Sequence, residues 1–221
     1  MSLWLLLAAV LAVLQWIARW YEIRWLHYLT KPTVMLALMA WLWTSGGWGG
    51  PLRWFSIGLI FSLLGDVFLM LPPSFFLAGL GAFLLGHLFY IIGFNSGALP
   101  FTPWLGVLAG VGILVAAGLI RYFLTALRKL SYSRRIRAAV VAYILVITSM
   151  VVSAFSTFQR PAWGLASALL VSCGAVLFAG SDSLLAYDRF VKRVKHAHLW
   201  IMMSYHFALF LILQGALIQF A

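Results

Sequence analysis

Two aspartates lie within long apolar stretches of this 221-residue sequence, and they are its strongest candidates for chemistry. The chain has four acidic residues. Glu22 and Asp188 stand among basic residues, where we expect solvated ion pairs, but Asp66 and Asp182 do not. An ionised carboxyl within a membrane costs about 2.5–3.5 kcal/mol, so it needs a partner or a proton. We therefore expect Asp66 and Asp182 to belong to a functional site.

Other polar side chains occupy the apolar stretches at comparable depth. His87 is followed by Tyr90 one helical turn later, and Ser62 precedes Asp66 by one turn. We expect the polar groups to converge with the aspartates on one cavity, and the binding candidates are Lys31, Ser62, His87, Tyr90, Ser181, Tyr205 and His206. Glycines at heptad spacing beside His87 are more typical of close helix packing than of catalysis; they are Gly79, Gly86 and Gly93.

The composition is that of a protein dissolved in lipid. Hydrophobic residues make up 65% of the chain and charged residues only 9%, and a soluble fold has no means of covering so much apolar surface. The net charge of +11 resides in short segments between apolar runs, a distribution that indicates membrane topology and anionic lipid contact rather than nucleic-acid binding. The single cysteine, Cys173, excludes a disulfide framework and a thiolate metal cluster.

The apolar runs predict an all-α membrane protein, a bundle of about eight transmembrane helices. An apolar helix of about 20 residues crosses a bilayer, and the runs lie near residues 2–18, 32–48, 52–71, 75–95, 103–120, 138–158, 162–186 and 198–219. No polar stretch is long enough to be a linker, so we expect a single domain over residues 1–221.

The basic residues predict the orientation of this bundle. Thirteen Lys and Arg residues follow the first, third, fifth and seventh runs, whereas only Arg53 and Arg160 follow the others. The positive-inside rule then places the basic turns in the cytoplasm and both termini on the non-cytoplasmic side. In a bacterium this membrane would be the plasma (inner) membrane. Lys31 is expected at the cytoplasmic rim, with Pro32 in the first turn of its helix, where proline is well tolerated.

Four segments together resemble the YhhN-like family of membrane proteins, which includes the lysoplasmalogenases. They are Lys31-Pro32-Thr33-Val34-Met35, Gly65-Asp66-Val67-Phe68-Leu69-Met70-Leu71, the stretch from Gly79 to Tyr90, and Ser181-Asp182-Ser183-Leu184-Leu185-Ala186. Their order fits along essentially the whole chain, and the match at Tyr205-His206-Phe207-Ala208 is poorer. The resemblance implies an enzyme that cleaves the vinyl ether bond of a lysoplasmalogen to a fatty aldehyde and a glycerophospho-alcohol.

That reaction suits the two intramembrane aspartates. Protonation of the vinyl ether at its β-carbon is the difficult step, and a carboxyl in an apolar site keeps the proton that this step needs. A second carboxylate stabilises the oxocarbenium ion and activates water, as in glycoside hydrolysis. We take Asp182 as the acid and Asp66 as the base, although the sequence alone does not fix this assignment. Lys31 would hold the substrate phosphate, and no cofactor or metal is expected.

Two other function classes stay open at this stage. A metal-dependent lipid hydrolase of the ceramidase type would use the two aspartates with His87 and His206 as zinc ligands. A transporter or receptor-like binding protein for lipids or small molecules would use intramembrane acids without cleaving anything. Chelator sensitivity would identify the first class, and substrate movement without cleavage would identify the second.

Overall fold

A computed structural model describes residues 2–221, in which eight long α-helices and two short 3₁₀ turns are joined by tight connections without any β-strand. The helices are α1 Leu3–Trp20, α2 Arg24–Thr44, α3 Leu52–Met70, α4 Phe76–Phe94, α5 Pro103–Lys129, α6 Arg134–Ser156, α7 Leu165–Phe190 and α8 Ala197–Phe220. Each apolar run of the sequence coincides with one helix. The ends agree within a few residues, except at the start of α2 and the end of α5.

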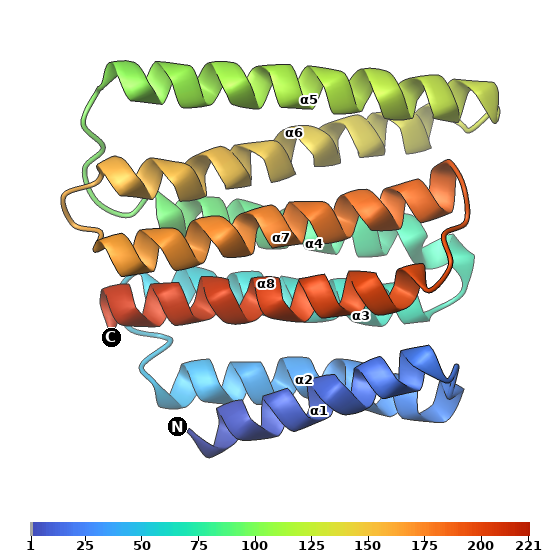
Figure 1. The fold of residues 1–221 in the computed structure, drawn as a ribbon, viewed down its shortest axis with the longest axis horizontal. Helices are drawn as coiled ribbons and strands as arrows, with labels where there is room; N and C mark the ends of the chain where they lie inside the picture. The colour runs from blue at the N-terminus through green and yellow to red at the C-terminus, as the bar shows by residue number, and fades with distance from the viewer. Residues whose placement is uncertain (1) are drawn as a thin grey trace.

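The helices lie side by side along their length, as Figure 1 shows. Helix α5 forms one edge of the bundle, α1 and α2 form the opposite edge, and the remaining helices lie between them. The most extensive packing joins α7 to α8, α3 to α4 and α1 to α2, so neighbours along the chain are also neighbours in space. The two termini lie at the same end of the bundle (Figure 1).

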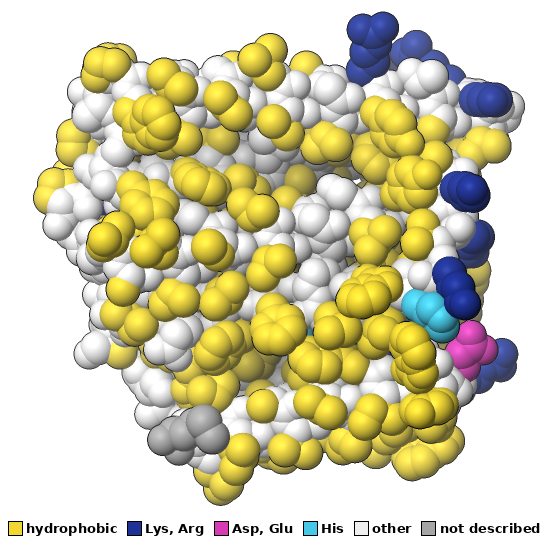
Figure 2. Space-filling model, viewed as in Figure 1, with side chains coloured by type: hydrophobic (Ala, Val, Ile, Leu, Met, Phe, Trp, Pro, Cys, Tyr) yellow, Lys and Arg dark blue, Asp and Glu magenta, His cyan; other side chains and the backbone are white. Residues whose placement is uncertain are grey.

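The outer surface shows that this is an integral, multi-pass membrane protein. Seven of the eight described helices are long and apolar enough to cross a bilayer. Helix α2 has sufficient length, but its first eight residues include Arg24, His27 and Lys31. Hydrophobic side chains cover the flank of the bundle in Figure 2, whereas the Lys and Arg side chains in that view gather along one edge, where the helices end.

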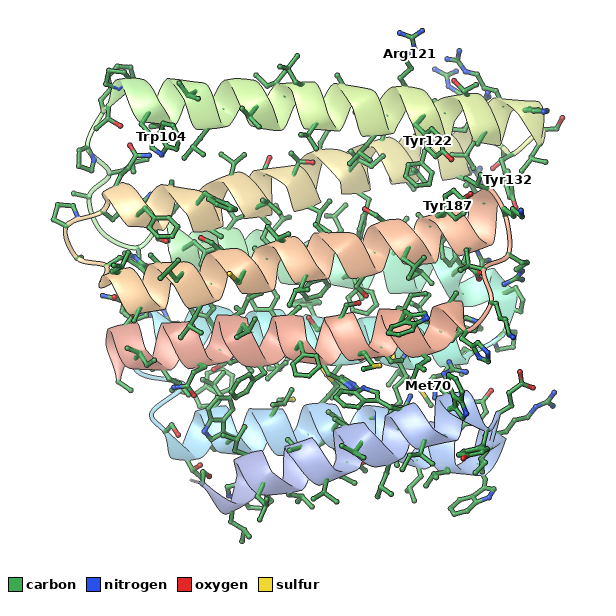
Figure 3. All side chains as sticks on the ribbon, in the orientation of Figure 1. Met70, Trp104, Arg121, Tyr122, Tyr132 and Tyr187 are labelled. Carbon is green, nitrogen blue, oxygen red and sulfur yellow. The ribbon has the colours of Figure 1, made fainter. Side chains whose placement is uncertain are left out.

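Four connections lie at this basic end, and they link α1 to α2, α3 to α4, α5 to α6 and α7 to α8. Tyr122, Tyr132 and Tyr187 lie near it, and Trp104 lies at the opposite end of α5 (Figure 3). Aromatic residues at the two ends of a bundle are typical of the two membrane interfaces. Arg121 belongs to α5 and not to a turn, because this helix continues nine residues beyond its predicted end.

The prediction that Pro32 lies in a first helical turn is wrong. Helix α2 begins at Arg24, so the proline lies inside the helix. A proline lacks the backbone N–H that a helix interior uses. The carbonyl that is left without this donor is that of Tyr28, four residues earlier, and the helix nevertheless continues through Pro32. The Thr33 hydroxyl beside the proline donates to the Leu29 oxygen at 2.9 Å.

The glycine spacing in α4 serves close packing, as predicted. A Cβ atom added at Gly86 would lie 3.1 Å from the backbone oxygen of Gly58 in α3, and one added at Gly93 would lie 2.6 Å from the Phe55 ring. Only glycine permits this approach, because any side chain would displace α3. The contact fixes the position of α4, and therefore of His87, against the rest of the bundle.

Candidate active site

The first of two buried carboxyl clusters is centred on Asp182 of α7. The hydroxyl of Tyr143, from α6, donates to Asp182 Oδ2. His87 Nε2, from α4, lies 3.3 Å from the same oxygen and 3.0 Å from the Tyr143 hydroxyl. The side chain of Asp182 is 11% exposed, whereas His87 is fully buried. Three helices thus bring a carboxyl, a phenol and an imidazole together within the bundle.

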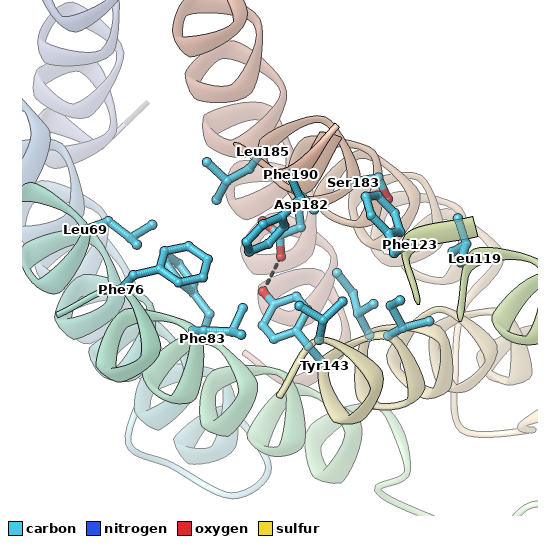
Figure 4. A pocket seen from close by; sticks show the side chains of 15 residues that line it. Leu69, Phe76, Phe83, Leu119, Phe123, Tyr143, Asp182, Ser183, Leu185 and Phe190 are labelled. Carbon is cyan, nitrogen blue, oxygen red and sulfur yellow. Dashed lines mark hydrogen bonds between the residues drawn. The ribbon is translucent and has the colours of Figure 1, made fainter. Parts of the chain in front are cut away.

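Asp182 and Tyr143 line an apolar cavity, which Figure 4 shows from close by. The cavity lies between α4, α5, α6 and α7, and hydrocarbon side chains form nearly all of its wall, among them Phe76, Leu80, Phe123, Ile144 and Phe190. Its volume is about 50 Å³, which admits a few water molecules. A hydrocarbon chain needs more space than this, and α5, which lines one side of the cavity, buries few of its residues.

The second cluster is centred on Asp66 of α3, and it has no access to solvent. Lys31 Nζ lies 2.9 Å from Asp66 Oδ1, and the Tyr205 hydroxyl donates to Oδ2 at 2.9 Å. The side chains of Lys31 and Asp66 are 5% and 1% exposed. The expectation that Lys31 lies at the rim is therefore wrong. Both oxygens of Asp66 are occupied, and the ammonium group compensates the charge of the carboxylate.

The aromatic ring of Phe178 lies between the two clusters. Its centroid is 4.6 Å from that of His87 and 5.2 Å from that of Tyr205. No hydrogen bond joins Asp66 to Asp182 in the described chain. The structure therefore places both aspartates in one bundle interior, but it gives each aspartate its own partners.

Three other predicted residues are buried in the bundle and hold helices together. The Ser62 and Tyr90 hydroxyls lie 3.2 Å apart between α3 and α4. Ser181 Oγ donates to the Ile201 oxygen at 3.0 Å, which ties α7 to α8. All three side chains are at most 1% exposed, so none of them reaches the cavity beside Asp182 in this conformation.

His206 faces away from both carboxyl clusters. It follows Tyr205 on α8, and successive helix residues point in different directions, so Tyr205 faces Asp66 whereas His206 faces α1. Trp16 Nε1 donates to His206 Nδ1 at 3.1 Å. The structure thus does not bring His206 together with the other candidate residues.

Tyr143 and Phe178 are the residues of the site that the sequence did not point out. Tyr143 lies in an apolar run that also carries Thr148, Ser149 and Ser153, and no candidate residue stands one turn from it, as His87 does from Tyr90. Phe178 gave no signal, because one phenylalanine in an apolar helix resembles any other. Among residues 2–221, no group of three or more His, Cys, Asp or Glu side chains comes together in a way that would hold a metal ion.

The site therefore offers a nearly buried carboxyl at the wall of an apolar cavity, with a phenol and an imidazole to orient it. Comparison with known proteins shows the family to which this site belongs. The chain matches the model of the YhhN family over residues 26–216. It is 33% identical over 197 residues to lysoplasmalogenase TMEM86B of Homo sapiens, which covers 89% of this chain and 77% of that protein.

A lysoplasmalogenase of Mycobacterium tuberculosis is 34% identical over 171 residues, which are 76% of this chain and 61% of that protein. The match to TMEM86B of Mus musculus is 33% over 194 residues, or 87% of this chain and 76% of the relative. No solved structure matches the chain significantly. Because the family model covers most of the sequence, this chain belongs to the YhhN family.

Proposed function

We propose that the protein is a lysoplasmalogenase-type hydrolase that cleaves the vinyl ether bond of a lysophospholipid within the membrane. The observation that carries the proposal is the carboxyl of Asp182 at the wall of an apolar cavity, held by Tyr143 and His87. The names of the relatives support the reaction class, since the human and mycobacterial proteins are both called lysoplasmalogenases.

In the proposed reaction, protonated Asp182 gives its proton to the β-carbon of the vinyl ether. The resulting oxocarbenium ion is captured by water, and the Asp182 carboxylate takes the proton that this water loses. The hemiacetal then collapses to a fatty aldehyde and a glycerophospho-alcohol. Tyr143 and His87 orient the carboxyl, and the hydrocarbon wall receives the alkenyl chain.

Asp66 has a different role in this proposal from the base that we expected. Its two oxygens are engaged by Lys31 and Tyr205, so water has no direct access to either oxygen. We assign to Asp66 the role of an ionised carboxylate that joins α2, α3 and α8 around the site. Tyr205 belongs to the same contact, Ser62 and Tyr90 join α3 to α4, and Ser181 joins α7 to α8. Of the predicted set, Asp182 and His87 lie closest to the chemistry.

We further propose that all eight helices of one domain, residues 1–221, cross the membrane. Helix α2 has 21 residues, and its buried ion pair removes the largest obstacle to insertion. The basic end of the bundle then faces the cytoplasm, both termini face the other side, and the site opens toward the cytoplasmic leaflet.

The test is turnover of a lysoplasmalogen by the purified protein, followed by release of free aldehyde. Wild-type protein should release aldehyde equally with and without a chelator, and Asp182→Asn should lower the rate by about 10³-fold or more. The variant must insert and purify like wild type. Release that a chelator abolishes and zinc restores would replace this mechanism with a metal-dependent one. Full activity of Asp182→Asn would overturn the assigned acid.

A further inference from the structure

An open pocket of about 580 Å³ lies at the basic end of the bundle, apart from the cavity beside Asp182. It is enclosed by the α1–α2 turn and the α7–α8 loop, and its cations and imidazoles include Arg19, Arg24, His27, Arg193, Lys195 and His198. Its two acidic residues are Glu22 and Asp188, and Asp188 is occupied by Arg193 Nη1 at 2.9 Å and the Val194 N–H at 2.8 Å. The pocket therefore keeps a positive balance.

His27 brings an oriented hydrogen-bond donor to this pocket. The Gln15 amide nitrogen lies 2.7 Å from His27 Nδ1, and the Gln15 amide oxygen accepts from the Thr30 hydroxyl. An amide nitrogen only donates, so Nδ1 accepts and the ring proton resides on Nε2. His27 is 8% exposed and lines the pocket, and this network of α1 and α2 fixes its ring.

Arg19 presents a second donor in the pocket wall. Its Nε atom is buried and has no hydrogen-bond partner in the described part of the chain. A guanidinium group has only donors, and a buried donor without an acceptor costs roughly 1–3 kcal/mol. An anion in the pocket would supply an acceptor for the Nε2–H of His27 and would lie beside the positive charge of Arg19.

The backbone is strained on both sides of the pocket. Among the described residues other than glycine, only Glu22, Ser131 and His196 have a positive φ, and Glu22 (56°) and His196 (55°) both line the pocket. This conformation costs about 1–3 kcal/mol for such residues, and it persists where surrounding contacts enforce it. The His196 ring stacks on Trp20 at 4.7 Å, which holds the α7–α8 loop against α1.

From this geometry we propose that the pocket binds the phosphate of a glycerophosphodiester, either as the headgroup of a lysophospholipid or as the soluble product. The identity of the phosphodiester rests on the proposed function. Lys31 is unable to hold this phosphate, because it lies one turn deeper than His27 and is paired with Asp66. Asp188, in the pocket wall, is six residues from Asp182, which is about 9 Å along the axis of α7 and on a different face of that helix.

Binding of two probes to full-length protein in a phosphate-free detergent tests the inference. The probes are glycerophosphoethanolamine and a lysophospholipid with a saturated ether chain, which the enzyme has no means of cleaving. Arg24→Gln and Lys195→Gln remove exposed pocket cations, so the fold is preserved, and Arg135→Gln removes an exposed cation at the same end outside this pocket. The double pocket variant should weaken binding by about tenfold, and the control should not.

The outcomes distinguish a lipid headgroup from a soluble phosphodiester as the ligand, and they test the phosphate site separately from the proposed hydrolase function. Weaker binding of both probes in the pocket variants identifies the free phosphodiester as a ligand, and weaker binding of the lipid alone identifies a membrane headgroup. Equal binding by the pocket variants and Arg135→Gln, or no binding by wild type, overturns the inference. Probe binding through these cations in a protein that releases no aldehyde would refute the proposed function and leave the phosphate site standing.

Discussion

At the scale of single residues, the Tyr143 hydroxyl sets the orientation of Asp182. Its O–H donates to Oδ2, and its oxygen also lies 3.0 Å from His87 Nε2, so one phenol connects the carboxyl with the imidazole. A hydrogen bond is typically worth about 0.5–1.5 kcal/mol to a neutral carboxyl group and about 1.5–3 kcal/mol to a charged carboxylate. The position of the acid therefore depends on this hydroxyl of α6 together with His87 of α4.

Tyr143→Phe removes this hydroxyl and keeps the ring. We expect kcat for aldehyde release to fall by about tenfold to a hundredfold, because Asp182 loses its orienting donor. Tyr122→Phe, at an exposed tyrosine of α5, is the matched control and should keep full activity. Equal rates for the two variants, measured with the same lysoplasmalogen, would show that the hydroxyl does not contribute.

Lys31 and Asp66 form an ion pair with no contact to solvent. Removing one partner of such a pair leaves a buried charge and typically costs about 3–5 kcal/mol, whereas removing both costs much less. Lys31→Met should therefore lower the thermal unfolding midpoint strongly, and Lys31→Met combined with Asp66→Asn should recover most of the loss. A double variant no more stable than Lys31→Met would contradict this account of the pair.

At the scale of helices, the α3–α4 contact depends on the absence of side chains. A Cβ atom at Gly86 would meet the backbone oxygen of Gly58 at 3.1 Å, and backbone atoms have little freedom to move aside. Gly81 in the same helix has open space around it, with no atom within 4 Å of an added Cβ. Substitution of these two glycines by alanine therefore distinguishes the effect of helix packing on stability from the effect of helix propensity.

Gly86→Ala should destabilise the protein by about 1–3 kcal/mol and lower activity, because α4 and His87 are pushed away from α3. Gly81→Ala should be neutral or stabilising by up to about 1 kcal/mol, since alanine favours the helix. Thermal unfolding of both variants in the same detergent is the measurement. If Gly86→Ala were as stable as Gly81→Ala, the close approach would not matter.

The number and positions of the helices were the features of this protein that its sequence predicted best. Runs of apolar residues gave eight helices, because length and hydrophobicity decide what crosses a bilayer. The start of α2 was missed because a proline is typical of a first helical turn, whereas this helix begins at Arg24 and continues through Pro32. The partners of Asp66 and Asp182 were missed because sequence position predicts depth along a helix but not which neighbour each face meets.

At the scale of the whole molecule, charge separates the two ends of the bundle. Of the fifteen Lys and Arg residues, Arg53 and Arg160 are the two that belong to the other end. Arg160 is 3% exposed, and it donates to the backbone oxygens of Asn95 and Gly97. Arg160 thus ties the α6–α7 connection to the α4–α5 connection. Because its charge is buried, the two ends of the bundle differ more in exposed positive charge than the residue count suggests.

Cysteine labelling tests the orientation that this asymmetry predicts. With Cys173→Ser as background, Ala98→Cys and Lys192→Cys place thiols on exposed positions at opposite ends of the bundle. A membrane-impermeant reagent added to intact cells should label Ala98→Cys only, and permeabilised cells should show both. Labelling of Lys192→Cys in intact cells would reverse the orientation and place the site in the outer leaflet.

Helix α5 stands between the cavity of Asp182 and the surrounding lipid, and its outward residues are widely exposed. A lysophospholipid that passes this helix stays in the bilayer throughout its approach. Its encounter with the enzyme is then two-dimensional, and the relevant concentration is its mole fraction among the other lipids of the leaflet. Adding inert lipid would slow the reaction at constant bulk substrate, and the aldehyde product would return to the same leaflet.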